Sequence, residues 1–309
     1  MRRGKELEAS TKLKHTGITE IADTYLRTIA SFHFVTGQQL TRRLYKMGMH
    51  TTVMARLKKL VDTGYLHVFW LPTVKSKSPN VYTLSAKGAK YLKEEAGLDV
   101  ERVYKPSELA ELSHTFLWHI LDLNNFLIAA YLFEKEHPAY RIAAMQHDLT
   151  LKKKPIEIPA PPKGLPSGKP KTLIPDAFLD IRMTPGGGKR QRQYNFWVEL
   201  DRGTETNIAG FKQKIRTLLQ AIITQKAQEY FSVRQFSAIV FPTTAGEKRV
   251  EQMRKWTFDV LTEEKAPEEI MTLFLFTFMS PDVDPATLFL TPVWRTPLSS
   301  YPPVSLFGE

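Results

Sequence analysis

Three of the carboxylate side chains in two short apolar segments in the middle of the chain are candidates for chemistry. Asp176 lies in the segment IPDAFLDI, and Glu199 and Asp201 lie in the segment NFWVELD. If both segments are β-strands, the two-residue period of a strand places Glu199 and Asp201 on one face. Burying unpaired carboxylates costs several kcal/mol, so this group needs a cation, a basic partner or open solvent.

Carboxylate oxygens are the ligands that Mg²⁺ and Mn²⁺ prefer, and either ion activates a bound water and neutralises charge on a phosphate. We therefore take Asp176, Glu199 and Asp201 as candidate metal ligands and catalytic residues of a phosphodiester hydrolase. Lys212 or Lys214, on the helix expected next, would stabilise the charge that develops on the phosphate. Ion pairs between these acids and nearby basic side chains are the structural alternative.

A further acid precedes these segments. Glu111 is followed three positions later by His114, and both fall on a helix expected from Ser107 to about Glu136. These segments resemble the PD-(D/E)xK nuclease fold, whose first helix often carries an acidic group, and the resemblance implies that Glu111 completes the catalytic group. His114 fits a hydrogen-bonded core histidine better than a metal ligand.

Composition excludes several other chemistries. The chain has no Cys, which excludes disulfides, thiolate zinc sites, iron–sulfur clusters and cysteine nucleophiles. The glycine-rich segment 185–189 lacks the spacing and the Ser or Thr of a phosphate-binding loop, so no nucleotide cofactor is expected. None of the eight histidines has the His-x-His spacing of a two-histidine relaxase.

Positive charge is concentrated in the first third of the chain. The net charge is +11, and residues 1–110 hold 19 Lys and Arg against 10 Asp and Glu. A basic region of this kind indicates phosphate binding, with nucleic acid favoured over an anionic lipid surface or an acidic protein. Residues 1–17 form a basic arm with no apolar segment after it, so we expect no secretory signal.

The elements expected in residues 18–104 are three short helices, a β-hairpin with a basic tip, and a closing helix. This order, with LKKLVDTGYLHVF followed by VYTLSAKGAKYL, resembles winged-helix domains. The resemblance implies a third helix in the DNA major groove and a wing on the backbone or minor groove. It assigns these contacts to His50, Thr51, Thr52, Arg56 and Lys59 of the helix and to Lys75 and Lys77 of the wing. A solvated helix face on a module that binds protein is the alternative.

A second domain is expected over residues 105–298. Its elements are a long helix, strands, and further helices, with an interruption at residues 152–172 that holds six Pro and six Lys and should form a mobile loop. The expected ranges are strands 140–149, 173–183 and 195–205, helix 206–230, strand 237–241, helix 246–264, and strands 273–279 and 288–294. The tail, residues 299–309, is apolar enough to dock on a surface or a partner.

The order of a helix, three strands, a helix and a strand resembles the PD-(D/E)xK nuclease superfamily, and Pro175-Asp176 with Glu199 resembles its first two acidic elements. The motif's lysine position holds Asp201, so the lysine would come from Lys212 or Lys214. The resulting expectation is an α/β (α+β) protein. It consists of an N-terminal winged helix-turn-helix followed by a nuclease-like mixed sheet flanked by helices.

IPDAFLDI, FWVELDRGTE and KQKIRTL, behind a winged helix, also resemble the replication-relaxation family of plasmid and mobile-element proteins over residues 20–245. The resemblance implies DNA binding in element replication or relaxation and leaves open whether DNA is cut. A non-catalytic regulator or replication-complex scaffold and a restriction or transposon end-cutting nuclease are the alternatives.

We expect double-stranded DNA as the partner, and leave open replication or mobile-element proteins and a homodimer. No stretch of about 18 uncharged apolar residues occurs, so no membrane is expected, and the cytoplasm is the default.

Overall fold

The computed structural model describes residues 17–45, 48–71, 79–100, 102–158, 171–184, 191–204 and 207–307. The chain divides into two compact mixed α/β units, unit 1 (Met1–His114) and unit 2 (Thr115–Glu309). The boundary expected at residue 105 falls before the short helix α5 (Pro106–Glu111), which groups with unit 1. Lys75, Lys77, the basic arm up to residue 16 and residues 159–170 of the expected loop lie outside the described residues.

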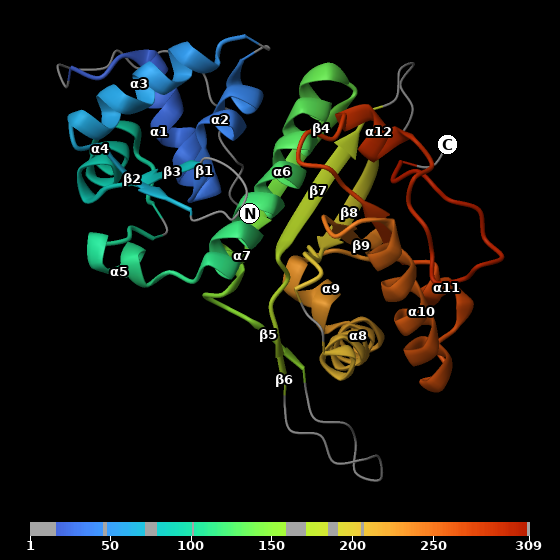
Figure 1. Cartoon of the computed structure of the whole chain (residues 1–309). Coiled ribbons are helices and arrows are strands. Elements are labelled where there is room, and N and C mark those ends of the chain that lie inside the picture. The colour runs from blue at the N-terminus through green and yellow to red at the C-terminus, as the bar shows by residue number, and fades with distance from the viewer. Residues whose placement is uncertain are drawn as a thin grey trace. The chain divides into compact units, whose positions relative to one another are not determined.

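Unit 1 contains the expected helices and hairpin in the expected order (Figure 1). The strands form one antiparallel sheet in the order β1-β3-β2, so β2 is an edge strand. The two-residue strand β1 was not predicted. The elements are α1 (Glu20–Phe32), β1 (Val35–Thr36), α2 (Gly37–Leu44), α3 (His50–Asp62), β2 (Leu66–Trp70), β3 (Asn80–Leu84) and α4 (Ala86–Ala96).

Local side-chain chemistry fixes where these helices begin. The Thr36 side chain accepts from Gln39 N, and the Gln39 side chain accepts from Thr36 N, which makes a capping box at the start of α2. Ser85 caps α4 in the same way by accepting from Gly88 N. A Cβ at Gly88 would lie 2.3 Å from the Tyr65 carbonyl oxygen, so α4 can pack this closely only with glycine there.

Unit 2 is built on a five-stranded mixed sheet in the order β10-β9-β8-β7-β4. β10, β9 and β8 run parallel, whereas β7 pairs antiparallel with both β8 and β4. The elements in chain order are α6 (His114–Glu136), β4 (Tyr140–His147), α7 (Asp148–Leu151), β5 (Ile156–Ile158), β6 (Lys171–Leu173), β7 (Ala177–Met183), β8 (Arg192–Val198), α8 (Ile208–Ile223), α9 (Lys226–Phe231), β9 (Ala238–Thr243), α10 (Glu247–Glu263), α11 (Glu268–Met271), β10 (Phe274–Phe278) and α12 (Pro285–Leu290).

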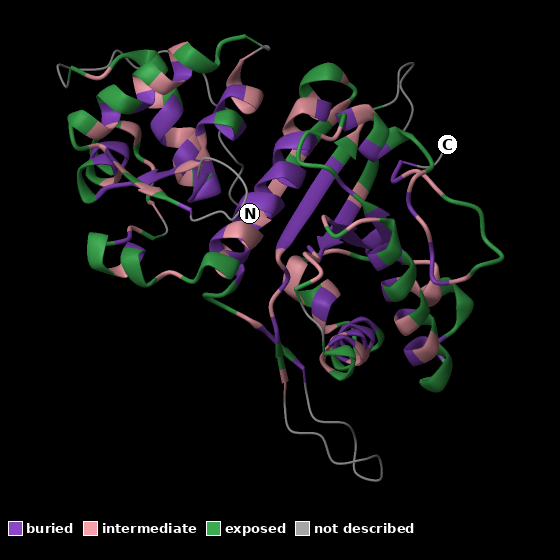
Figure 2. Ribbon diagram, in the orientation of Figure 1, coloured by how far each residue is buried: buried purple, intermediate pink, exposed green. Residues whose placement is uncertain are grey.

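Helices cover both faces of this sheet (Figures 1 and 2). On one face Phe196 packs near Phe307 of the tail, which contacts Phe133 of α6 and Phe289 of α12. On the other face Trp197 belongs to a core cluster with residues of α8, α9 and α10. Neighbouring residues of β8 therefore point into different layers, as the pleat of a strand requires. The tail, which was expected to dock on a surface or a partner, thus packs through Phe307 against its own chain.

α6 is the one helix in the described part of the chain that is long and apolar enough to span a membrane by length and composition. Two-thirds of that apolar window, 67%, is buried inside the protein. Figure 2 shows α6 largely buried along the sheet, which is the environment of a core helix.

Several expected elements differ from those found. The helix expected over residues 107–136 is two helices, because Leu112 adopts extended angles (φ −64°, ψ 129°) and ends α5 before α6 begins. The helix expected over residues 206–230 is also two, because Gln225 adopts a left-handed conformation (φ 59°) between α8 and α9.

Two further expectations are corrected. The strand expected over residues 288–294 is preceded and partly replaced by α12, because Asp284 accepts from Thr287 N at 2.7 Å and Pro285 takes the first turn. The loop expected over residues 152–172 is ordered at both ends, where β5 and β6 pair antiparallel. Burial of Ile156, Ile158 and Leu173 in the core stabilises this pairing.

Candidate functional site

Two of the three candidate carboxylates lie at the ends of two neighbouring strands of the unit 2 sheet. Asp176 directly precedes β7 and Glu199 directly follows β8, and the adjacent Ala177 and Val198 are register partners. The antiparallel pairing of β7 and β8 therefore places both acids at neighbouring strand ends. This proximity was expected from the sequence, provided that the two segments formed a hairpin.

Asp176 accepts one hydrogen bond and makes one ion pair. Its Oδ2 accepts from Leu200 N at 2.8 Å, and its Oδ1 lies 3.1 Å from His119 Nε2 of α6. Burial alone raises the pKa of Asp176, but His119, Lys214 and the Leu200 N–H outweigh it and hold that pKa below its ordinary value. Burial alone lowers the pKa of His119, but the attraction of nearby carboxylates raises it overall.

Glu199 is the most deeply buried acid of the group, with a side chain only 1% exposed. Its Oε1 accepts from Trp197 Nε1 at 2.6 Å, and its Oε2 pairs with Lys214 Nζ of α8. Burial raises the pKa of Glu199 to about 7. The negative charge of Asp176 also raises this pKa, whereas the positive charge of Lys214 lowers it. The two carboxylates thus interact with each other as well as with their basic partners.

These side chains line a pocket of about 180 Å³ that is partly open to solvent. His119 comes from α6, on one face of the sheet, and Lys214 comes from α8, on the other (Figure 1). The side chains of His119 and Lys214 are 27% and 35% exposed, so an incoming molecule can reach both. Three acids, Asp176, Glu199 and Asp201, and three basic side chains, His119, Arg202 and Lys214, therefore line one small pocket.

Asp201 lines the same pocket but is committed to structural hydrogen bonds. Its Oδ2 accepts from Gly203 N at 2.9 Å, from Thr243 Oγ1 at 2.8 Å and from Arg249 Nε at 3.0 Å, and its Oδ1 accepts from Arg249 Nη2 at 2.8 Å. Its side chain is 11% exposed and that of Arg249 is 8% exposed. The geometry therefore gives Asp201 the task of joining β9 and α10 to the strand end, in place of the expected metal ligation.

The structure separates the two candidate lysines. Lys212 Nζ donates to Asp259 of α10 at 3.0 Å, and Lys212 does not line the pocket. Lys214, two positions later on α8, contacts Glu199. Two positions apart on a helix, these side chains point about 200° away from each other, but the sequence did not show which of them faces the strand end.

Glu111 and His114 belong to unit 1, whereas this pocket is lined by residues of unit 2. Glu111 ends α5 in unit 1, on a different helix from α6, and neither residue lines the pocket. His119 fills the place on α6 that was expected for Glu111. The available signal was a lone titratable side chain in the apolar stretch FLWHIL, which is more often a core histidine than a functional one.

Arg202, the residue after Asp201, pairs with Asp122 of α6. Arg202 Nε donates to Asp122 Oδ2 at 2.8 Å, and its Nη1 donates to the Thr115 carbonyl at 3.4 Å. Burial raises the pKa of Asp122 despite the attraction of Arg202. This pair connects the motif around Glu199 to α6 and so fixes the helix that carries His119.

In unit 1, the candidate DNA contacts lie on α3. His50, Thr51 and Lys59 are exposed, whereas Thr52 and Arg56 are partly buried. His50 Nδ1 lies 3.3 Å from Thr41 Oγ1, and Arg56 donates to the Tyr45 hydroxyl at 2.8 Å. His50 and Arg56 also support the packing of α3 against α2 and the residue that follows it.

Among the residues that the structure describes, no group of three or more His, Asp or Glu side chains is arranged to hold a metal ion. The pocket offers two carboxylates, Asp176 and Glu199, as oxygen ligands. A cation there would complete its shell with water or a ligand.

The family model described as Replication-relaxation matches residues 26–237, more than half of the chain and parts of both units. The chain belongs to this family. For this replication-relaxation protein the match supports a role connected with the replication of a plasmid or mobile element. The matched residues include Asp176, Glu199 and Lys214 as well as α3. No curated protein and no solved structure matches the sequence.

Proposed function

We propose that this replication-relaxation protein binds double-stranded DNA through unit 1 and hydrolyses a phosphodiester bond in unit 2 with Mg²⁺ or Mn²⁺. The observation that carries the proposal is the convergence of Asp176, Glu199 and Lys214 at one open pocket. The proposal makes the protein a metal-dependent DNA endonuclease of element replication.

The order of elements in unit 2 supports a nuclease-type fold. Apart from α7, β5 and β6 inserted after β4 and α9 inserted after α8, the series is the helix α6, the antiparallel strands β4, β7 and β8, the helix α8 and the strand β9, which is parallel to β8. This is the order that the PD-(D/E)xK resemblance implies. Asp176 and Glu199 take the two acidic positions, and Lys214 of α8 takes the part of the lysine that is missing at position 201.

The donor set of the pocket fits a small divalent cation. Mg²⁺ keeps several waters and is commonly bound by one or two carboxylates together with substrate phosphates. Asp176 and Glu199 would hold it, and their mutual repulsion, part of the reason for the pKa of about 7 at Glu199, would be relieved by a cation. The ion would lower the pKa of a bound water so that it can attack the phosphate.

The basic side chains of the pocket have complementary tasks. Lys214 would turn from Glu199 toward the phosphate and stabilise its developing negative charge. His119 holds its proton more tightly than a free imidazole because of its carboxylate neighbours, and adds a second positive group beside the phosphate. The Arg202 pair with Asp122 keeps α6, and with it His119, at the strand ends.

We base the winged-helix assignment of unit 1 on its three helices, the hairpin formed by β2 and β3, and the closing helix α4. In that arrangement α3 enters the major groove. Thr51 and Lys59 are exposed on α3 and would face the DNA. The excess positive charge of residues 1–110 would supply the phosphate contacts that dominate affinity.

Incubation of supercoiled plasmid with the full chain and Mg²⁺ or Mn²⁺ tests the hydrolytic part. We expect nicked or linear product that is lost in Glu199→Gln and in Lys214→Met. Lys212→Met is the matched control, because Lys212 lies on the same helix and pairs with Asp259 outside the pocket. Intact plasmid with every ion, or product that persists in Glu199→Gln, would contradict the proposal.

A non-catalytic DNA-binding regulator or scaffold is the second candidate. It is favoured by the pairing of each pocket carboxylate with a basic side chain and by the commitment of Asp201 to Arg249. This candidate predicts DNA binding without nicking. A restriction or transposon end-cutting nuclease would share the metal chemistry, and the position of the cut would distinguish it.

A further inference from the structure

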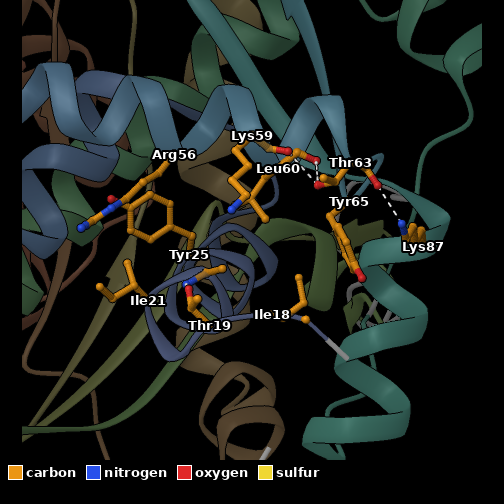
Figure 3. A pocket seen from close by; sticks show the side chains of 12 residues that line it. Ile18, Thr19, Ile21, Tyr25, Arg56, Lys59, Leu60, Thr63, Tyr65 and Lys87 are labelled. Carbon is orange, nitrogen blue, oxygen red and sulfur yellow. Dashed lines mark hydrogen bonds between the residues drawn. The ribbon is translucent and has the colours of Figure 1, made fainter. Parts of the chain in front are cut away.

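Unit 1 contains a second pocket, of about 490 Å³, far larger than the opening at the strand ends of unit 2. It lies between α1, the C-terminal half of α3 and the first turn of α4 (Figure 3). Its volume is in the range of sites that bind small organic molecules. The proposed DNA contacts do not account for a cavity of this size.

The walls of this pocket are largely apolar. Ile21 and Ala22 contribute from the first turn of α1, Ile18 contributes from just before it, and Leu60 contributes from α3. The rings of Tyr25 and Tyr65 add aromatic surface at two sides of the cavity (Figure 3). Ile21 is 43% exposed, so an apolar surface that folding has not covered faces the opening. An occupant with an apolar body would cover it.

The charged side chains around these walls are all basic. Arg56, Lys59 and Lys87 line the pocket, and no acidic side chain is among the described residues that do so. Lys87 Nζ donates to the Thr63 carbonyl at 2.7 Å and lies 4.3 Å from the centre of the Tyr65 ring, which fixes it at the rim. Three positive charges beside an apolar cavity favour an anion with an apolar body.

We infer that this pocket binds a small organic anion, an alkyl or aryl carboxylate or sulfonate, with its apolar body between α1 and α3 and its anionic group near Lys59. Arg56 and Lys59 belong both to this pocket and to the α3 surface proposed for DNA. The bound anion therefore neutralises charge that DNA phosphates need, and it weakens DNA binding. This second consequence rests on the proposed function, whereas the ligand site itself does not.

Fluorescence titration of the full chain with anilinonaphthalene sulfonate, an aromatic anion, tests the site without DNA. We expect saturable binding at one site per chain that decanoate displaces. Lys59→Glu should weaken binding by about tenfold, because it reverses a charge at the rim, and Ala22→Trp should abolish it by filling the cavity. Lys58→Glu is the matched control, since Lys58 is the adjacent lysine of α3 and lies outside the pocket.

Equal binding by the wild type, Lys59→Glu and Ala22→Trp, with circular dichroism showing that each variant is folded, would overturn the inference. DNA affinity is then measured with and without decanoate. Wild-type affinity should fall, and that of Ala22→Trp should not respond. DNA binding without any binding of the dye would refute the ligand site alone, and dye binding without DNA binding would refute the proposed function alone.

Discussion

Asp201 and Arg249 form a buried ion pair, and its removal tests whether Asp201 serves the fold or a metal ion. Asp201 accepts from Arg249 Nε at 3.0 Å and Nη2 at 2.8 Å, and the side chains are 11% and 8% exposed. Asp201→Ala leaves the Arg249 charge buried without this carboxylate, which typically costs about 3–5 kcal/mol. Thr243 and Gly203 lose an acceptor as well.

A loss of this size is large enough to measure in two ways. In a unit of this length each kcal/mol lowers the melting temperature by roughly 2–4 °C, so we expect a fall of about 10 °C. With a slope of about 2 kcal/mol per M of urea, the unfolding midpoint should fall by about 2 M. Scanning calorimetry and urea titration followed by circular dichroism provide the two readings.

Two variants serve as controls. Asp259→Ala breaks the Lys212 pair, whose side chains are 23% and 36% exposed, and should cost no more than about 1 kcal/mol. The double variant Asp201→Leu/Arg249→Met removes both charges and should recover most of the lost stability. If Asp201→Ala melts within about 2 °C of the wild type while metal-dependent nicking disappears, the structural role is refuted and Asp201 is a metal ligand.

Three other perturbations have defined outcomes. The pKa of Glu199 is raised from an ordinary 4.5 to about 7, so its contribution to the free energy of unfolding is fully present below pH 4.5 and is lost as the pH rises through 7. Urea titrations between pH 4.5 and 7 should show the free energy of unfolding of the wild type falling as the pH rises. The same fall in Glu199→Gln would contradict the assignment of this pH dependence to Glu199. Lys59→Ala should weaken DNA binding and reduce the dependence of log affinity on log salt by about one, as anisotropy would measure; an unchanged slope places the contact elsewhere. Phe307→Ala removes a buried ring whose centre lies 5.3 Å from that of Phe133 and 4.6 Å from that of Tyr140, and it should lower the free energy of unfolding by about 3–5 kcal/mol. A melting temperature close to that of the wild type would show that the tail does not stabilise the packing of α6 on the sheet.

Much of unit 1 was predictable because local signals agree there. Thr36 and Ser85 mark helix starts by their side-chain chemistry, and Gly64, in a left-handed conformation (φ 77°), ends the segment after α3. The apolar periodicity of α1 and α3 matches most of the residues that are buried, although Ile21 in the first turn of α1 is 43% exposed. Each of these features depends on residues a few positions apart.

The partners in the candidate site depend on long-range packing and were less predictable. The strand period placed Asp201 on the face of Glu199, but its partner Arg249 lies on α10, which the period of β8 does not position. The choice of Lys214 over Lys212 depends on how α8 rotates against the sheet. His119 was missed because a single histidine in an apolar helix resembles a core residue, and its partner Asp176 lies far away in the sequence.

The apolar segment before Trp294 shows a different cause of error. A short apolar run is compatible with a strand or a buried helix, and periodicity alone does not choose between them. Here the deciding signal was Asp284 followed by Pro285, a cap and a first-turn residue, which starts α12. Capping chemistry carried more information at this position than hydropathy.

The most direct test of the account is a titration of the full chain with Mn²⁺, followed by electron paramagnetic resonance of the free ion. The account predicts one bound Mn²⁺ per chain, lost in Asp176→Asn/Glu199→Gln and retained in Lys212→Met, with affinity that weakens as the pH falls below 7 because Glu199 takes up a proton. Absence of Mn²⁺ binding in the wild type, or binding that survives the double substitution, would contradict it.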